Sequence, residues 1–278
     1  MARKKATPAA AGFTTIDVAV RNRIGIVTLN RPDVHNAFNE TLIAELTEAM
    51  RSLGADDDVR VVVLAGNGPS FCAGADLNWM KRMATYGRAQ NLADAKGLAG
   101  MLRALHDVPK PTVARIHGAA YGGGVGLAAC CDIVIAAVEA TFSLSEAKLG
   151  LIPSTISPYV INAIGARQAS RYFLTGERFE AAEAFRLGLA HDIVPIAQLD
   201  DRVNETLGPL LVAGPHAQRE CKALIRAVAH RPIDDKLVAD TVRRIAAVRA
   251  SPEGKEGVAA FLEKRSPAWV PADLRKAR

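Results

Sequence analysis

The chain has few cysteines for its length, four in 278 residues. Cys72, Cys130, Cys131 and Cys221 form no CxxC pair, and two of them are adjacent. We therefore expect neither a disulfide framework nor a zinc site, and a reducing cytoplasm is the simplest location. The histidines also show no spacing typical of metal ligands.

A long hydrophobic run is also missing. The longest uncharged stretch around the glycines, residues 116–131, is too short and too rich in glycine to span a membrane. No stretch resembles the apolar core of a signal peptide, and residues 1–12 are expected to form a flexible leader. We therefore expect no membrane association.

Aromatic residues make up only 5% of the chain and do not alternate with basic residues, which disfavours base stacking on nucleic acid. Lysine and arginine exceed aspartate and glutamate by 35 to 29, which gives a net charge of +6. Part of this excess lies in the terminal stretches ARKK and LRKAR, as is typical of solvated tails. The alternative is attraction of an anionic ligand, such as a nucleotide phosphate or a nucleic acid.

Glycine, in contrast, is concentrated in GAAYGGGVGL, residues 118–127. The stretch does not fit a dinucleotide fingerprint because Leu127 stands where the third glycine should be, and no GKS or GKT follows as in a P-loop. A GxSxG nucleophile elbow is absent as well. A strand, a glycine turn and a helix N-terminus remain. This arrangement either offers free N–H groups to an oxygen or allows close packing of a helix on a strand.

Strands and helices alternate up to about residue 196, which predicts a layered α/β core over residues 13–200. Beyond it the pattern is only helical, which predicts a C-terminal helical region over residues 201–278. The expected strands lie at residues 13–20, 24–30, 59–66, 111–118 and 132–137. The expected helices lie at residues 39–53, 89–105, 125–131, 199–211, 215–230, 235–250 and 253–265.

A second loop of small residues, SFCAGADLNW, also follows a buried strand and leads into a helix that Asp76 can cap. Two such loops could each supply one backbone N–H to a developing oxyanion. Glu146 follows in FSLSEAKLGLIP among apolar residues. It is either a solvated glutamate paired with Lys148 or a partly buried general acid/base with a raised pKa.

Five ordered stretches resemble the crotonase (enoyl-CoA hydratase/isomerase) superfamily over about residues 13–270: RPDVHNAFN, FCAGADL, HGAAYGGGVGLAACCDI, FSLSEAKLGLIP and SPEGKEGVAAFLEKRSPAW. The resemblance implies a crotonase-like spiral of ββα units with a helical C-terminal trimerisation region. It implies a homotrimer or a hexamer and an acyl-CoA thioester substrate, with no cofactor beyond the CoA that is part of the substrate.

The resemblance also implies site residues. The N–H groups of Ala73 and Gly123 would hold the thioester oxygen, and Glu146 would be the acid/base. The residues expected to bind substrate or CoA are Ala73, Gly74, Ala75, Asp76, Gly123, Phe261 and Lys264. The last two resemble residues that hold the adenosine part, often from a neighbouring subunit.

One position departs from the family pattern. Typical hydratases of the family carry two glutamates twenty residues apart, and here these positions hold Gly126 and Glu146. A single glutamate resembles a bacterial hydratase group that acts on 3-methylglutaconyl-CoA in leucine degradation, which we favour. The alternatives are a Δ3,Δ2-enoyl-CoA isomerase and, from another class, a non-catalytic RNA-binding or structural member of the fold.

Overall fold

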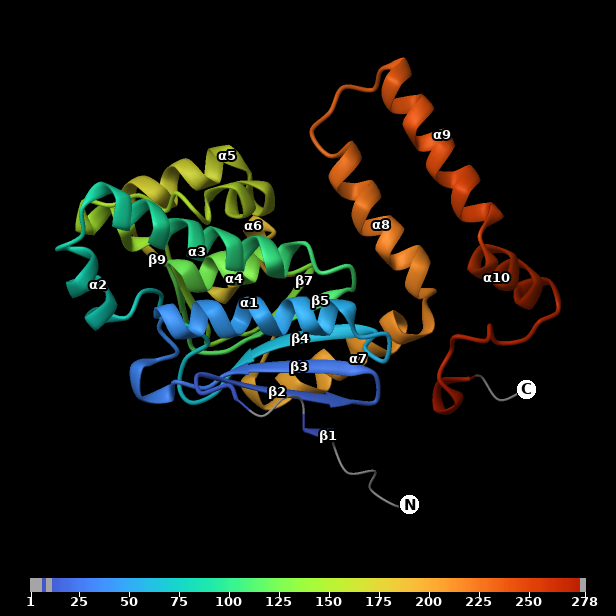
Figure 1. The fold of residues 1–278 in the computed structure, drawn as a ribbon, viewed down its shortest axis with the longest axis horizontal. Helices are drawn as coiled ribbons and strands as arrows, with labels where there is room; N and C mark the ends of the chain where they lie inside the picture. Colours follow the sequence, from blue (N-terminus) through green and yellow to red (C-terminus); the bar gives the residue numbers. More distant parts are fainter. Residues whose placement is uncertain (1–6, 9–11, 276–278) are drawn as a thin grey trace. The chain divides into compact units, whose positions relative to one another are not determined.

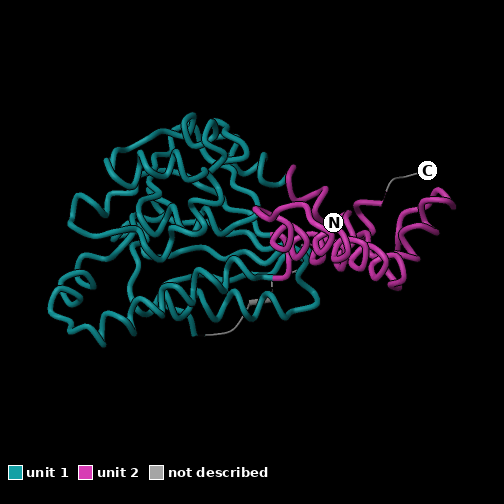
Figure 2. The backbone as a smooth tube through the Cα atoms, turned by 90° about the horizontal axis from the view of Figure 1, so that it is seen from above, with its two compact units in different colours: residues 1–108, 112–204 teal, residues 109–111, 205–278 magenta. Residues whose placement is uncertain are grey.

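The computed structural model describes residues 7–8 and 12–275. It divides into two compact units, shown in Figure 2: unit 1 contains residues 1–108 and 112–204, and unit 2 contains residues 109–111 and 205–278. Most of the expected flexible leader at residues 1–12 lies outside the described residues. Within it, Thr7–Pro8 form strand β1, which pairs with β2 in antiparallel orientation.

The larger sheet of unit 1 has the strand order β1-β2-β3-β4-β5-β7-β10 within the described residues (Figure 1). Its strands after β1 are β2 (Ile16–Arg21), β3 (Ile24–Leu29), β4 (Val61–Gly66), β5 (Thr112–Ile116), β7 (Ile133–Ala137) and β10 (Asp192–Val194). β2 and β3 form the predicted hairpin, and the pairs from β3 onward are parallel. The continuous apolar sequence of β4 fits a strand of a parallel sheet that is covered on both faces.

A smaller sheet holds β6 (Ala119–Tyr121), β8 (Thr141–Ser143) and β9 (Arg178–Glu180). β6 and β8 are parallel, whereas β8 and β9 are antiparallel. An isolated bridge between Cys72 and Ala120 adds the loop after β4 to this sheet. The small sheet therefore carries both loops that the sequence singled out.

The first four helices of unit 1 form where the sequence predicts helices, whereas α5 (Ser157–Thr175) and α6 (Ala181–Leu187) were not predicted. α1 (Glu40–Ala55) begins at Asn39, whose side chain accepts a hydrogen bond from the Leu42 N–H at 2.9 Å. Its buried face includes Leu42, Ile43, Leu46 and Met50. The other predicted helices of this unit are α2 (Leu77–Met83), α3 (Arg88–His106) and α4 (Gly123–Cys130).

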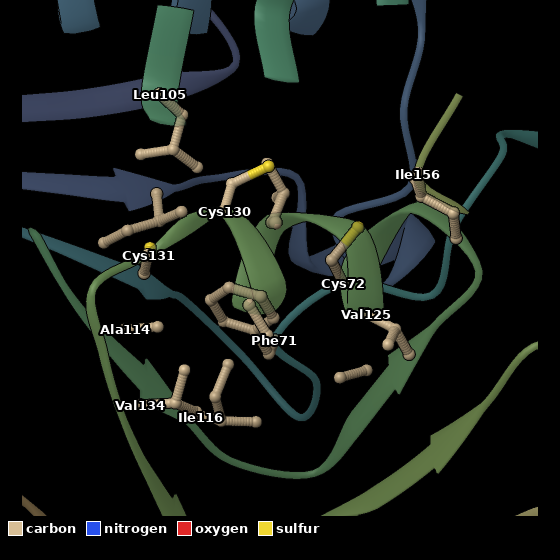
Figure 3. Packing of buried hydrophobic residues seen from close by; sticks show 14 of the residues in the cluster. Phe71, Cys72, Leu105, Ala114, Ile116, Val125, Cys130, Cys131, Val134 and Ile156 are labelled. Carbon is tan, nitrogen blue, oxygen red and sulfur yellow. The ribbon is translucent and has the colours of Figure 1, made fainter. Parts of the chain in front are cut away.

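The core of unit 1 packs around α4, which Figure 3 shows among side chains from several strands and helices. Cys72, Cys130 and Cys131 are buried in it. Burial raises the pKa of the Cys72 thiol to about 12, so this thiol stays protonated at neutral pH. These cysteines therefore act as small apolar core residues.

Residues 199–262 are mainly helical, as predicted. They contain α7 (Leu199–Val212), α8 (Pro215–Val228), α9 (Asp235–Ala250) and α10 (Pro252–Leu262). Within unit 2, Glu253 at the start of α10 accepts hydrogen bonds from the first N–H groups of α8, those of His216 and Ala217. No helix in the described part of the chain is long and apolar enough to cross a membrane.

Candidate active site

Two loops of unit 1 meet side by side. One joins β4 to α2, and the other is the glycine turn between β6 and α4. The Cys72 N–H donates to the Ala119 carbonyl at 3.0 Å, and the Tyr121 N–H donates to the Cys72 carbonyl at 2.9 Å. A Cβ atom on Gly74 would lie only 3.0 Å from the Tyr121 carbonyl oxygen. The two backbones are therefore in direct contact, as the sequence predicted for paired donor loops.

Each glycine of the turn has a separate reason to lack a side chain. Gly122 has a φ of +50°, which strains other residues. A Cβ on Gly123 would lie 2.1 Å from Cε2 of Phe38, and one on Gly124 would lie 2.3 Å from the Cys72 carbonyl oxygen. The glycines are therefore required both by the tight turn at Gly122 and by close packing at Gly123 and Gly124.

The structure corrects the predicted position of one backbone donor. The Ala73 N–H already donates to the His35 carbonyl at 2.9 Å, which contradicts its assignment as an oxyanion donor. Phe38 bonds to the residues on either side of Ala75, as in a parallel ladder, so the Ala75 N–H points away from it. Among the described residues neither the Ala75 N–H nor the Gly123 N–H has an acceptor, and both residues are partly exposed.

The segment between β3 and α1, residues 31–38, packs against the loop that joins β4 to α2. Asn36 is fully buried with a φ of +55°, and its side-chain oxygen accepts from the Arg31 N–H at 2.8 Å. Its amide nitrogen donates to the carbonyls of Asn67 and Ser70 at 2.9 and 2.8 Å. No local pattern reveals these bonds, because their acceptors lie more than thirty residues away.

Asp76 caps α2, as predicted. One carboxylate oxygen accepts from the N–H groups of Asn78 and Trp79 at 2.8 and 3.1 Å, and the other pairs with Arg31 at 2.9 Å. Burial alone would raise the pKa of Asp76, but the amides of this helical turn and the Arg31 guanidinium outweigh it and lower the pKa. Because both oxygens are bonded and the residue is 5% exposed, Asp76 holds the loop and offers no free oxygen to a ligand.

Glu146 lies on the short 3₁₀ helix η2 (Ser145–Leu149), directly after β8. A Cβ on Gly122 would lie 3.1 Å from its Oε1 atom, so the carboxyl group sits against the glycine turn. Its Oε2 atom is buried and has no hydrogen-bond partner among the described residues. Burial raises the pKa of Glu146. This environment favours the acid/base interpretation over an ion pair with Lys148, which the structure does not contain.

The position of the absent second carboxyl group is occupied by another side chain. Gly126 is buried inside α4, and a Cβ there would lie 2.2 Å from Cγ2 of Ile156. Ile156 precedes α5 and is 2% exposed. The missing acid at residue 126 thus leaves no open space, because isoleucine packs against the bare helix backbone.

Phe261 and Lys264 lie in unit 2. Phe261 lies in the last turn of α10, and 81% of its surface is exposed to solvent. Lys264 lies just beyond that helix and has a φ of +55°. Their contact with adenosine stays a prediction. Across the described ranges, no group of three or more His, Cys, Asp or Glu side chains is placed to hold a metal ion.

Comparison with known proteins gives one consistent family. The model of the family described as enoyl-CoA hydratase/isomerase matches residues 19–271. A probable enoyl-CoA hydratase of Mycobacterium bovis is 36% identical, covering 93% of this chain and 98% of that protein. The 2,3-dehydroadipyl-CoA hydratase of Escherichia coli is 32% identical, covering 90% and 96%. The crystal structure of an enoyl-CoA hydratase from Shewanella pealeana superposes with a TM-score of 0.90 at 42% identity, covering 92% and 96%.

Proposed function

The chain belongs to the enoyl-CoA hydratase/isomerase family, and on that premise we propose that it is a hydro-lyase that adds water across the 2,3 double bond of an acyl-CoA. The crotonase-like α/β fold with a helical C-terminal region, expected from the sequence, is confirmed by its structural neighbours. One observation carries the proposal: two unclaimed backbone N–H groups and one buried carboxyl group meet at the glycine turn.

In this proposal, the Ala75 and Gly123 N–H groups hold the thioester oxygen. Addition of water to the β-carbon moves negative charge onto this oxygen, so donors placed there stabilise the enolate more than the ground state. The positive end of the α4 dipole adds to this effect at Gly123. Ala73, Gly74 and Ala75 would line the path of the CoA chain through their backbone.

Glu146 takes one proton from water as the hydroxyl oxygen bonds to the β-carbon, and it returns a proton to the α-carbon. One carboxyl group can serve both steps because the first step protonates the carboxylate and the second step returns it to its charged form. A pKa raised by burial brings the group closer to the values that favour proton transfer near neutral pH.

We propose 3-methylglutaconyl-CoA as the acyl substrate, as in leucine degradation. The stretches GGGVGLAACCDI and SEAKLGLIPSTISPYVINAIG support it by resemblance. The named substrate of the E. coli relative, a dehydroadipyl-CoA, is also the thioester of a dicarboxylic acid.

The test supplies the purified protein with 3-methylglutaconyl-CoA and separately with crotonyl-CoA, in water enriched in ¹⁸O. We expect a labelled 3-hydroxyacyl-CoA, formed faster from the first substrate. No hydroxylated product from either thioester would exclude the hydratase function.

An isomerase is the second candidate, since a single carboxyl group is enough to carry a proton between two carbons. The packing of Ile156 over Gly126 leaves no room for a second acid at residue 126, and this supports the isomerase as a candidate. A 3-enoyl-CoA converted to the 2-enoyl-CoA without ¹⁸O uptake, and with no hydration, would establish it.

We also propose that the protein self-associates as a trimer or a hexamer. Val238, Val242 and Ile245 form an exposed apolar stripe along α9, and a groove of about 530 Å³ lies between α9 and α10. Surfaces of this kind mark contacts with other chains. The free thiols support a reducing compartment such as the cytoplasm.

A further inference from the structure

Phe38 contacts both loops of the candidate site. It lies between the 3₁₀ helix η1 (Pro32–Val34) and α1, and it is 1% exposed. Its N–H donates to the Gly74 carbonyl at 2.6 Å, and its carbonyl accepts from the Asp76 N–H at 2.9 Å. The backbone of Phe38 therefore fixes the peptide units on both sides of Ala75.

The side chain of Phe38 reaches the other donor. A Cβ on Gly123 would lie 2.1, 2.8 and 3.2 Å from three carbons of the phenyl ring, so the ring lies directly against the first residue of α4. A flat aromatic ring has few rotamers, and well-packed interiors transmit displacements rather than absorb them. One residue thus contacts the backbone at both unclaimed N–H groups.

We propose that Phe38 is a positioning residue that sets the separation of the Ala75 and Gly123 N–H groups. Its backbone fixes one donor, and its ring stops α4 from moving toward that donor. The inference rests on the proposed function of this donor pair. It explains why both Gly123 and a large aromatic residue are needed: the ring occupies the place of a Cβ atom.

The experiment reads the donor pair directly. Butyryl-CoA and 3-methylglutaryl-CoA, each carrying ¹³C at the thioester carbonyl, cannot be hydrated, and their carbonyl stretch moves to lower frequency when two donors bind the oxygen. We expect this shift with the wild-type protein and a smaller shift with Phe38→Leu, which keeps the backbone bonds and removes the ring. We also expect kcat to fall about tenfold to a hundredfold with KM nearly unchanged, the size expected for misplaced catalytic groups.

Phe179→Leu is the matched control. Phe179 is also buried, at 6% exposure, and packs on Phe142 and Tyr172. It should lose thermal stability as Phe38→Leu does, yet keep the carbonyl shift and kcat. If Phe38→Leu does not fold, Phe38→Met leaves more of the volume filled and answers the same question.

The outcomes separate the two proposals. A full carbonyl shift and unchanged kcat in a folded Phe38 variant would overturn the positioning role and leave the donor pair intact. No shift of either thioester in the wild-type protein would overturn the donor pair, and the role of Phe38 with it.

Discussion

Glu146 shows how one residue is tuned by its surroundings. We predict that Glu146→Gln lowers turnover by about 10²- to 10⁴-fold, the usual contribution of a general acid/base, while affinity for saturated acyl-CoA changes little. Steady-state kinetics and calorimetric titration with butyryl-CoA would measure the two effects. Unchanged turnover would remove Glu146 from the mechanism.

The same substitution has a predicted pH signature in stability. Burial raises the pKa of Glu146 above its ordinary value of 4.5, so the folded protein holds this proton more tightly than the unfolded chain. The wild type therefore loses stability relative to Glu146→Gln as the pH rises through the folded pKa, and the difference is absent below the unfolded pKa. Urea unfolding at acidic and neutral pH would show a gap only at neutral pH; an equal gap at both would contradict the raised pKa.

Gly126 gives a second prediction at the residue scale. Gly126→Glu places its side chain into Ile156, and we expect a loss of about 1–3 kcal/mol in unfolding free energy together with reduced activity. Adding Ile156→Ala should recover part of the stability, because it removes the atoms in the way. Chemical denaturation of the two single variants and the double variant measures the coupling, and strictly additive effects would argue against the contact.

Single residues were predictable only where chemistry is local. The position of Glu146 followed from the sequence, and the structure supplies the burial that favours an acid/base role. The family resemblance predicts the donor of the AGAD loop at Ala73, whereas the structure leaves the Ala75 N–H without an acceptor among the described residues. Which N–H of the loop stays free depends on how the loop pairs with the segment that contains His35 and Phe38. A shift of this pairing by one residue would turn a bonded N–H outward and an open N–H toward the partner.

Among the elements, α1 and α4 were predictable because their signals lie within a few residues. Asn39 followed by an apolar period marks α1, and the small apolar stretch after the glycines marks α4. The segment 31–38 could not be predicted in the same way. Its structure depends on Asn36 bonds to a loop distant in sequence, which local composition does not encode.

The loop before α2 offers a test at this scale. We predict that Asp76→Asn keeps the helix cap but loses the Arg31 pair, costs about 1–2 kcal/mol of stability near neutral pH, and lowers kcat by moving Ala75. Because the pKa of Asp76 is lowered, this contribution is present above the unfolded pKa and disappears as the pH falls through the folded pKa.

Asp234→Asn is the control for that variant. Asp234 caps α9 by accepting from the Leu237 N–H at 2.8 Å, and α9 belongs to unit 2. The control should leave kcat unchanged. A similar fall in kcat for both variants would show that loss of a carboxylate charge at a helix start in general, and not the loop at Ala75, governs the rate.

At the scale of the whole molecule, the exposed stripe on α9 carries the prediction. Val242→Glu places a charge in the centre of the stripe and should convert the proposed trimer or hexamer to smaller species, since an unpaired charge is costly in an apolar contact. Light scattering after size-exclusion chromatography measures the mass. Ala247→Glu, on the opposite side of the same helix, should leave the mass unchanged, and a monomeric wild type would contradict the assembly.

The helical region after Leu199 could be predicted from its periodicity, whereas the partner of its apolar stripe could not. An amphipathic pattern indicates that a face is to be buried, but it does not state in which chain the covering surface lies.

The contact between Gly126 and Ile156 has a consequence for how such sites diverge during evolution. A lineage that gained an acid at residue 126 first would disrupt its core, and one that shortened residue 156 first would open a cavity with no gain in chemistry. Under the proposed mechanism the two changes would be advantageous only together, so selection would disfavour the intermediate that carries one of them. Once isoleucine packs against Gly126, this epistasis would make a later gain of a second carboxylate at residue 126 unfavourable.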